Sequence, residues 1–237
     1  RDTARLHKPP SETMALTLEQ VEAIRAAVRS WRRAPGTPGP PPDGQLEQII
    51  EVMLGTSARI GEVLAIRKCD VDVTVTPATV RICGTIVSPS GKPTYRQSHP
   101  KTAKSTRVVS VPTFVAEVIR QRLAVVSQEP AEGLLFHTRK GTPLTTNNIR
   151  RRLRSVLSDA GIEGVTPHAF RRTVATVLDR ASGPDLAAEL LGHTSSKITK
   201  AHYIEPDEAV DPVTAEILEA LAPKPPEGSS VTDGQAE

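Results

Sequence analysis

The feature that most constrains the fold of this chain is a change in the period of its apolar residues. Before residue 65 and after residue 112, apolar side chains recur every three or four positions, which is typical of amphipathic helices. Between these regions, β-branched runs separated by proline and glycine occupy residues 71–75, 80–87, 95–99 and 107–111, as in short hairpins. The sequence therefore predicts an α+β fold, mainly α-helical, with one small antiparallel sheet.

Local signals predict where several helices begin. Thr17 and Gln20 have the spacing of a capping box, so we expect a first helix whose apolar face starts at Leu18. Thr166 and Pro167 are a typical N-cap and first helical residue for a later helix. Further helices are predicted from about residue 43, around 60–64, and over 112–126, 149–161, 184–191, 196–203 and 207–221.

The charge of the chain is unevenly distributed. The formal net charge is +3, but residues 205–237 contain nine acidic residues and one basic residue. Residues 1–204 therefore hold 29 basic and 18 acidic residues, a net charge of +11. A basic body of this kind favours a nucleic-acid partner.

Composition excludes several classes of protein and site. No stretch approaches the ~18 consecutive apolar residues of a membrane span. Cys69 and Cys83 stand outside any CxxC or Cys/His spacing, which predicts reduced thiols in a cytoplasmic protein rather than disulfides or a zinc site. Asp70 and Asp72 come nearest to an acidic metal cluster, but they begin a predicted strand and are expected to be structural. We therefore expect no metal.

One folded domain is expected over residues 13–221. Residues 1–12 contain Pro9 and Pro10 without apolar periodicity, which is typical of a linker from an upstream segment. Residues 222–237 are expected to form a disordered acidic tail.

Two segments combine groups that can bind a phosphate. Arg59 and Glu62 lie three residues apart on one predicted helical face, where Glu62 can orient the guanidinium group. The alternative is an ordinary surface ion pair. Lys101, Lys104 and Arg107 lie on a predicted hairpin tip between two strands, where their charges can reach a DNA backbone. The alternative there is a solvated basic loop.

Two later segments carry groups that can transfer a proton or attack a phosphate. His168 and Arg171 share a face at the start of a predicted helix, whose N-terminal dipole favours anions. Tyr203 follows His193 by ten residues, whereas Tyr95, the other tyrosine, is expected to pack in a strand. The alternatives are a structural histidine and an ordinary aromatic residue.

In this order, the four segments resemble the tyrosine recombinase (phage integrase) family, over about residues 13–221. The family signature is Arg, then Lys on a β-hairpin, then HxxR, then His or Trp, then Tyr. The matching residues are Arg59, Lys101, His168, Arg171, His193 and Tyr203.

The sequence differs from the common family motifs at two positions. Ser57 stands where glycine is frequent before the first arginine, and Arg172 stands where a second histidine often follows HxxR. Lys101 is preferred to Lys104 because the family lysine commonly precedes threonine.

The resemblance implies a tyrosine-recombinase catalytic-domain fold with a small antiparallel three-stranded sheet. It also implies cleavage and rejoining of DNA without metal, cofactor or ATP. Tyr203 would attack the scissile phosphate to give a 3′-phosphotyrosyl link and a free 5′-hydroxyl. Lys101 would protonate that leaving oxygen, His168 would assist proton transfer at the tyrosine, and His193 would hydrogen-bond the phosphate. The two signature arginines would offset the developing charge, with Glu62 in support.

The implied partners are duplex attachment sites of a phage or other mobile element, in a homotetramer on DNA, with accessory DNA-bending or directionality proteins. Residues 207–221 would dock on a neighbouring protomer or, alternatively, cap the chain's own core. Only six residues are aromatic, which disfavours a single-strand binder that stacks bases. Basic residues expected to contact DNA are Lys104, Arg107, Arg139, Lys140, Arg150, Arg151, Arg152 and Arg172.

Two other functions compete with a recombinase. A type IB topoisomerase uses a similar set of tyrosine, arginine, lysine and histidine. A DNA-binding regulator without enzyme activity would use the same basic helices, but it leaves the spacing of His193 and Tyr203 unexplained.

Overall fold

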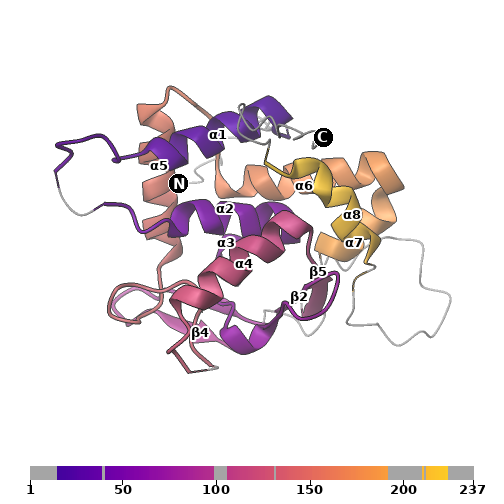
Figure 1. The fold of residues 1–237 in the computed structure, drawn as a ribbon, viewed down its shortest axis with the longest axis horizontal. Coiled ribbons are helices and arrows are strands. Elements are labelled where there is room, and N and C mark those ends of the chain that lie inside the picture. Colours follow the sequence, from indigo (N-terminus) through magenta and orange to yellow (C-terminus); the bar gives the residue numbers. More distant parts are fainter. Residues whose placement is uncertain are drawn as a thin grey trace, which may run out of the picture.

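Helices make up most of the fold, and the short strands gather along one side of them (Figure 1). The computed structural model describes residues 15–38, 41–98, 106–130, 132–191, 210 and 212–223. The helices in chain order are α1 (Leu18–Ser30), α2 (Gln45–Thr56), α3 (Ile60–Val63), α4 (Thr113–Val125), α5 (Thr146–Asp159), α6 (Pro167–Ser182), α7 (Pro184–Leu191) and α8 (Val213–Leu218). The α+β, mainly α-helical prediction is confirmed, and the helix predicted over 196–203 lies outside the described residues.

The first helix begins as predicted, but its apolar face starts one turn later. Gln20 N donates to Thr17 Oγ1 (3.2 Å) and Thr17 N donates to Gln20 Oε1 (2.9 Å), which forms the capping box. Leu18 is 49% exposed, whereas Val21 and Ile24 are buried. The prediction that Leu18 belongs to the core face is therefore wrong.

The predicted sheet has three antiparallel strands, and a two-stranded ribbon lies beside it in the chain. β1 (Val71–Asp72), β2 (Thr79–Ile82) and β5 (Arg107–Ser110) pair in the order β1-β2-β5. β3 (Thr85–Val87) pairs with β4 (Tyr95–Gln97). The single run predicted over 80–87 is therefore two strands. Gly84 at the break leaves room for Arg96, because a Cβ on it would lie 2.6 Å from Arg96 Nη2.

β2 and β3 follow each other in the chain, but they pair with different strands: β2 pairs with β5, and β3 pairs with β4. Ile82 faces Arg107 in one ladder, and Thr85 faces Gln97 in the other. Two residues, Cys83 and Gly84, separate β2 from β3. The strands that flank Lys101 and Lys104 pair with β3 and β2, and not with each other as the predicted hairpin tip requires. The two lysines themselves lie outside the described residues.

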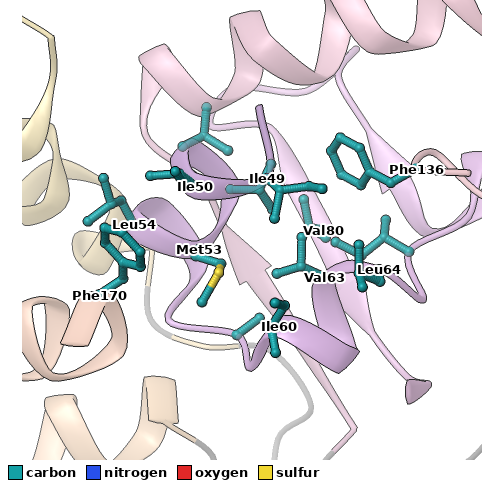
Figure 2. Packing of buried hydrophobic residues seen from close by; sticks show 14 of the residues in the cluster. Ile49, Ile50, Met53, Leu54, Ile60, Val63, Leu64, Val80, Phe136 and Phe170 are labelled. Carbon is teal, nitrogen blue, oxygen red and sulfur yellow. The ribbon is translucent and has the colours of Figure 1, made fainter. Parts of the chain in front are cut away.

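Helix α2 lies at the centre of the hydrophobic core (Figure 2). Residues 49–56 are buried on every side, as expected for a helix with almost no polar face. Figure 2 shows Leu54 of α2 beside Phe170 of α6, and Ile49 on the side facing Val80 of β2 and Phe136. Helices from both halves of the chain therefore close around α2.

The C-terminal segment packs on the chain's own core. Val210 N donates to Val108 O (2.9 Å), and Thr113 N donates to Glu219 Oε2 (2.8 Å). Arg25 Nη2 donates to Leu221 O (2.7 Å). These contacts place residues 212–221 against the chain's own core, as the alternative of an intramolecular cap predicts. Among the helices described, none has both the length and the apolar character to cross a membrane.

Gly55 of α2 packs closely against the start of α4 and provides a test of this packing. A Cβ at Gly55 would lie 2.2 Å from Val115 Cγ2 and 3.1 Å from Pro112 Cδ. We expect Gly55→Ala to lower the free energy of unfolding by about 1–3 kcal/mol, the usual effect of overpacking a core. Urea denaturation measures this free energy, and Ser155→Ala, at an exposed position on α5, is the control. An unchanged or raised stability in Gly55→Ala would contradict this packing.

Candidate active site

A tight backbone turn between α2 and α3 places the first of the predicted site residues. Ser57 ends α2 with φ 55°, in the left-handed region that glycine adopts most easily, so the glycine expected here from the family resemblance would suit this turn. Arg59 follows as the N-cap of α3. Arg59 Nη1 donates to Glu62 Oε1 (3.0 Å), and Arg59 N donates to Glu62 Oε2 (2.9 Å). Glu62 therefore holds both the backbone and the side chain of Arg59.

Glu62 is buried, and Arg59 extends from it toward solvent. The Glu62 side chain is 6% exposed, whereas that of Arg59 is 51% exposed. Burial raises the pKa of Glu62, but the charges of Arg107 and Arg59 and the bonds from Arg59 outweigh it and leave the pKa below its ordinary value. The carboxylate is therefore ionised at neutral pH, and the predicted pairing of Arg59 with Glu62 is present.

Arg171 is a buried cation oriented by uncharged acceptors. It is 4% exposed, on the first turns of α6. Its guanidinium donates to the carbonyl oxygens of Ser57 and Leu191. Burial, followed by repulsion from Arg59 and Arg107, lowers the pKa of Arg171 to about 10. Arg171 thus stays protonated at neutral pH, because none of these effects brings its pKa near 7.

His168 completes a small cationic cavity one turn before Arg171. The cavity has a volume of about 200 Å³ and is lined by Arg59, Ile60, Arg150, Thr166, Pro167, His168 and Arg171. Desolvation lowers the pKa of His168, and the charges of Arg172, Arg171 and Arg59 lower it further. His168 is therefore neutral at pH 7 and can accept a proton.

The other predicted basic residues fall into separate groups. Arg150 lines the cavity of His168, an association that the sequence did not reveal. Arg139, Lys140 and Arg152 line a second cavity of about 500 Å³ together with Arg32. Arg151 is exposed on α5 and Arg172 is half-buried on α6. The remaining predicted site residues Lys101, Lys104, His193 and Tyr203 lie outside the described residues.

Arg107 does not lie where its prediction as a DNA-contact residue requires. It is 4% exposed, and its Nη2 donates to Glu62 Oε2 (3.3 Å). The strand pattern predicts this burial. Alternate residues of a strand point to the same face, and Arg107 therefore shares its face with Val109 and Val111, which are both buried. Arg107 therefore faces the protein interior rather than a phosphate.

The acidic pair Asp70 and Asp72 has structural partners. Arg67 donates from its backbone N and from Nε to Asp70 Oδ2, and from Nη2 to Asp70 Oδ1. Asp72 Oδ1 accepts from Thr74 N (2.9 Å). Within the part of the chain that the structure describes, no three His, Cys, Asp or Glu residues gather in a way that could hold a metal ion.

A family model described as "Phage integrase family" matches residues 15–209. The chain belongs to the phage integrase family. This match covers most of the sequence, including all six residues of the predicted signature.

Curated relatives in this family are longer than the present chain. It is 31% identical over 210 residues to the tyrosine recombinase XerA of Thermococcus kodakarensis, covering 85% of this chain and 63% of that protein. It is 29% identical over 215 residues to an integrase of Streptomyces ambofaciens, covering 83% of this chain and 50% of that one. The present chain thus spans about half to two thirds of the length of these relatives.

The fold agrees with solved structures of integrases. The Tn1549 transposon integrase, solved in complex with transposon right end DNA, superposes with a TM-score of 0.65 over 92% of this chain and 69% of that chain, at 21% identity. The XerA recombinase superposes with a TM-score of 0.56 at 20% identity, covering 92% of this chain and 63% of that one. The tyrosine-recombinase catalytic-domain fold expected for this family member is therefore confirmed.

The neutral state of His168 can be measured without DNA. We expect an NMR titration of His168 in the isolated protein to give a midpoint below the ordinary 6.5. Arg172→Ala should move the midpoint upward, because among the nearby charges that of Arg172 lowers the pKa of His168 the most. Arg139→Ala, which removes a charge from the second cavity, is the matched control and leaves the midpoint unchanged. A His168 midpoint above 6.5 in the unaltered protein would contradict the described environment.

Proposed function

We propose that this chain is the catalytic part of a site-specific DNA recombinase that cleaves and rejoins duplex DNA. The observation that carries the proposal is the meeting of Arg59, His168 and Arg171 around one small cavity, although more than 100 residues separate the first from the other two. Several fixed positive charges and one neutral imidazole suit a phosphodiester, whose reaction develops negative charge. Membership in the phage integrase family supports this proposal.

The two signature arginines would stabilise the reacting phosphate in different ways. Arg171 is buried, and its guanidinium group donates to the carbonyl oxygens of Ser57 and Leu191, which fixes its orientation. Arg59 is half-exposed and aimed by Glu62, so its guanidinium can meet a nonbridging oxygen. Both groups are in place before the reaction, which is the condition for effective electrostatic stabilisation.

Proton transfer would then complete the reaction. A tyrosine hydroxyl has an ordinary pKa of ~10 and needs a base or cations to attack. In the proposal His168 assists removal of the proton from Tyr203, which forms a 3′-phosphotyrosyl bond as the 5′-oxygen leaves. Lys101 donates a proton to that oxygen, and His193 hydrogen-bonds the phosphate. Attack by another 5′-hydroxyl on the phosphotyrosyl bond rejoins DNA without metal or ATP.

The proposed substrate is a pair of duplex attachment sites of a phage or other mobile element in the bacterial cytoplasm, held by a homotetramer with accessory DNA-bending or directionality proteins. The Tn1549 relative was solved with transposon DNA, which supports a mobile-element role. We place the catalytic domain at residues 13–221, between a linker at 1–12 and an acidic tail at 222–237. Phosphate contacts are assigned to Lys104, Arg139, Lys140, Arg150, Arg151, Arg152 and Arg172.

Covalent capture of DNA tests the proposed reaction. A random-sequence duplex pool is incubated with the protein, and adducts that survive denaturation are sequenced to obtain the site. A nicked suicide duplex with that site should then form an adduct with the unaltered chain and none with Tyr203→Phe, because the phenolic oxygen makes the bond. Absence of any adduct favours a DNA-binding regulator. An adduct that relaxes supercoiled plasmid but never exchanges strands between two sites favours a topoisomerase.

Removal of Arg59 tests transition-state stabilisation. We expect Arg59→Ala to slow adduct formation by about 10²–10³-fold, the usual effect of losing one oxyanion-stabilising donor. Affinity for the uncut site, measured with a Tyr203→Phe background, should change much less. Equal losses in affinity and in rate would show that Arg59 only binds the ground state.

The second cavity is assigned to DNA phosphates and gives a salt-dependence test. We expect Arg139→Ala combined with Lys140→Ala to reduce the slope of log K against log salt by about 2, because each lost phosphate contact removes about 0.9. Arg120→Ala, which removes a 47% exposed charge from α4, is the control and leaves the slope unchanged. An unchanged slope in the double variant would remove these residues from the DNA interface.

A further inference from the structure

Two arginines share the buried carboxylate of Glu62, and only one of them reaches solvent. Arg59 binds it from the side of the cavity, through Nη1 at 3.0 Å and its backbone N at 2.9 Å. Arg107 binds it from the interior, with Nη2 3.3 Å from Glu62 Oε2. The Glu62 and Arg107 side chains are 6% and 5% exposed, compared with 51% for Arg59. Glu62 thus connects an interior cation to the cation of the cavity.

A carboxylate buried to this degree needs a nearby positive charge to remain ionised. Among the residues that the structure describes, the charged groups that act on Glu62 are Arg59 at the start of its own helix, Arg107 from β5 and Arg171 from α6. Arg59 is half-exposed, so solvent weakens its hold on Glu62. Arg107 is the buried counter-charge directly bonded to the carboxylate. Its place on β5 is fixed by the pairing with Ile82 of β2.

We propose that Arg107 is a positioning residue for DNA cleavage, acting through Glu62 to fix Arg59 against the scissile phosphate. This inference rests on the proposed recombinase function, and it replaces the predicted phosphate contact of Arg107. Arg107 keeps Glu62 charged, and a charged Glu62 accepts hydrogen bonds from Arg59 through both oxygens. A protonated Glu62 would convert one acceptor oxygen into a donor and release either the backbone or the guanidinium of Arg59.

The electrostatics of Glu62 give the direction of the effect with pH. Among the influences that lower the pKa of Glu62 against burial, the charge of Arg107 is the largest. Removing that charge raises the pKa, so the carboxylate becomes protonated as the pH falls and cleavage is lost on the acid side. Raising the pKa by one makes the protonated carboxyl about tenfold more abundant relative to the carboxylate at a given pH. We therefore expect the acid limb of the cleavage rate to move to higher pH in Arg107→Leu.

The decisive experiment measures adduct formation on the suicide duplex from pH 5.5 to 8.5. We expect Arg107→Leu to cleave more slowly than the unaltered chain, with the largest rate ratio at pH 5.5 and a ratio that shrinks steadily toward pH 8.5. Arg107→Lys retains the charge and should restore most of the acid-side rate. The salt slope of DNA binding should be unchanged in both variants, because Arg107 meets no phosphate in the proposal.

A second pair of variants separates Glu62 from His168, which also titrates on the acid side. Glu62→Gln removes the titrating carboxylate, so adding Arg107→Met to it should not move the acid limb any further. This double variant also removes both buried charges, which keeps the test available if Arg107→Leu alone fails to fold. In the DNA-free protein with ¹³C-labelled glutamate, NMR should show a higher Glu62 pKa in Arg107→Leu, or in Arg107→Gln as a second choice.

The outcomes distinguish this inference from the function on which it rests. No adduct with the unaltered chain overturns the proposed recombinase. An adduct whose rate and pH profile are the same with and without Arg107 overturns only the positioning role. A salt slope that falls in Arg107→Leu and is retained in Arg107→Lys would also overturn it, because the charge of Arg107 would then contact a phosphate.

Discussion

The carboxylate of Glu62 lies among three arginines that repel each other, and the described part of the candidate active site depends on it. Arg59 and Arg107 both lower the pKa of Arg171, and the charge of Glu62 acts in the opposite direction. Without a carboxylate at this point, burying Arg107 and Arg171 so close to Arg59 would carry a large electrostatic cost. Glu62 accepts a hydrogen bond from Arg107 of β5, and its charge favours the protonated form of Arg171 on α6.

The partners of the arginines explain how the cavity remains positive. Arg59 and Arg107 are bonded to a carboxylate, whereas Arg171 is bonded to carbonyl groups of Ser57 and Leu191. Carbonyls orient a guanidinium group without cancelling its charge. The left-handed turn at Ser57 thereby has two effects, because it directs a carbonyl to Arg171 and brings Arg59 to the start of α3.

Much of the fold was predictable because its signals are local. The capping box of Thr17, the proline at position 167 and the helical spacing of apolar residues each act within one or two turns, and the structure confirms the helices they predict. Leu18 was misplaced because periodicity identifies a face but not where the neighbouring element begins to cover it. The break at Cys83-Gly84 was missed because it depends on Arg96, which lies more than ten residues away.

The sequence identifies the residues of the candidate site, but it predicts only part of their arrangement in space. Arg59 with Glu62, and His168 with Arg171, lie within one turn of each other, so helical spacing brings each pair together. That the two pairs share a cavity depends on packing around α2, which no local pattern encodes. The charge of Arg107 predicts a DNA contact, whereas its alternation with Val109 and Val111 along the strand predicts the buried position that the structure shows.

β2 pairs with β5, and β3 pairs with β4. The register of each ladder therefore does not depend on the length of the segment between β4 and β5. Register on either side is set by its own ladder, one containing Arg107 and Ile82, the other Gln97 and Thr85. Residues can therefore be inserted or deleted between Gln97 and Arg107 without slipping either ladder, and doubling such a connection costs only about 0.6 kcal/mol of closure entropy. The strand that carries Arg107 to Glu62 thus keeps its register through its own pairing with β2, independently of the ladder formed by β3 and β4.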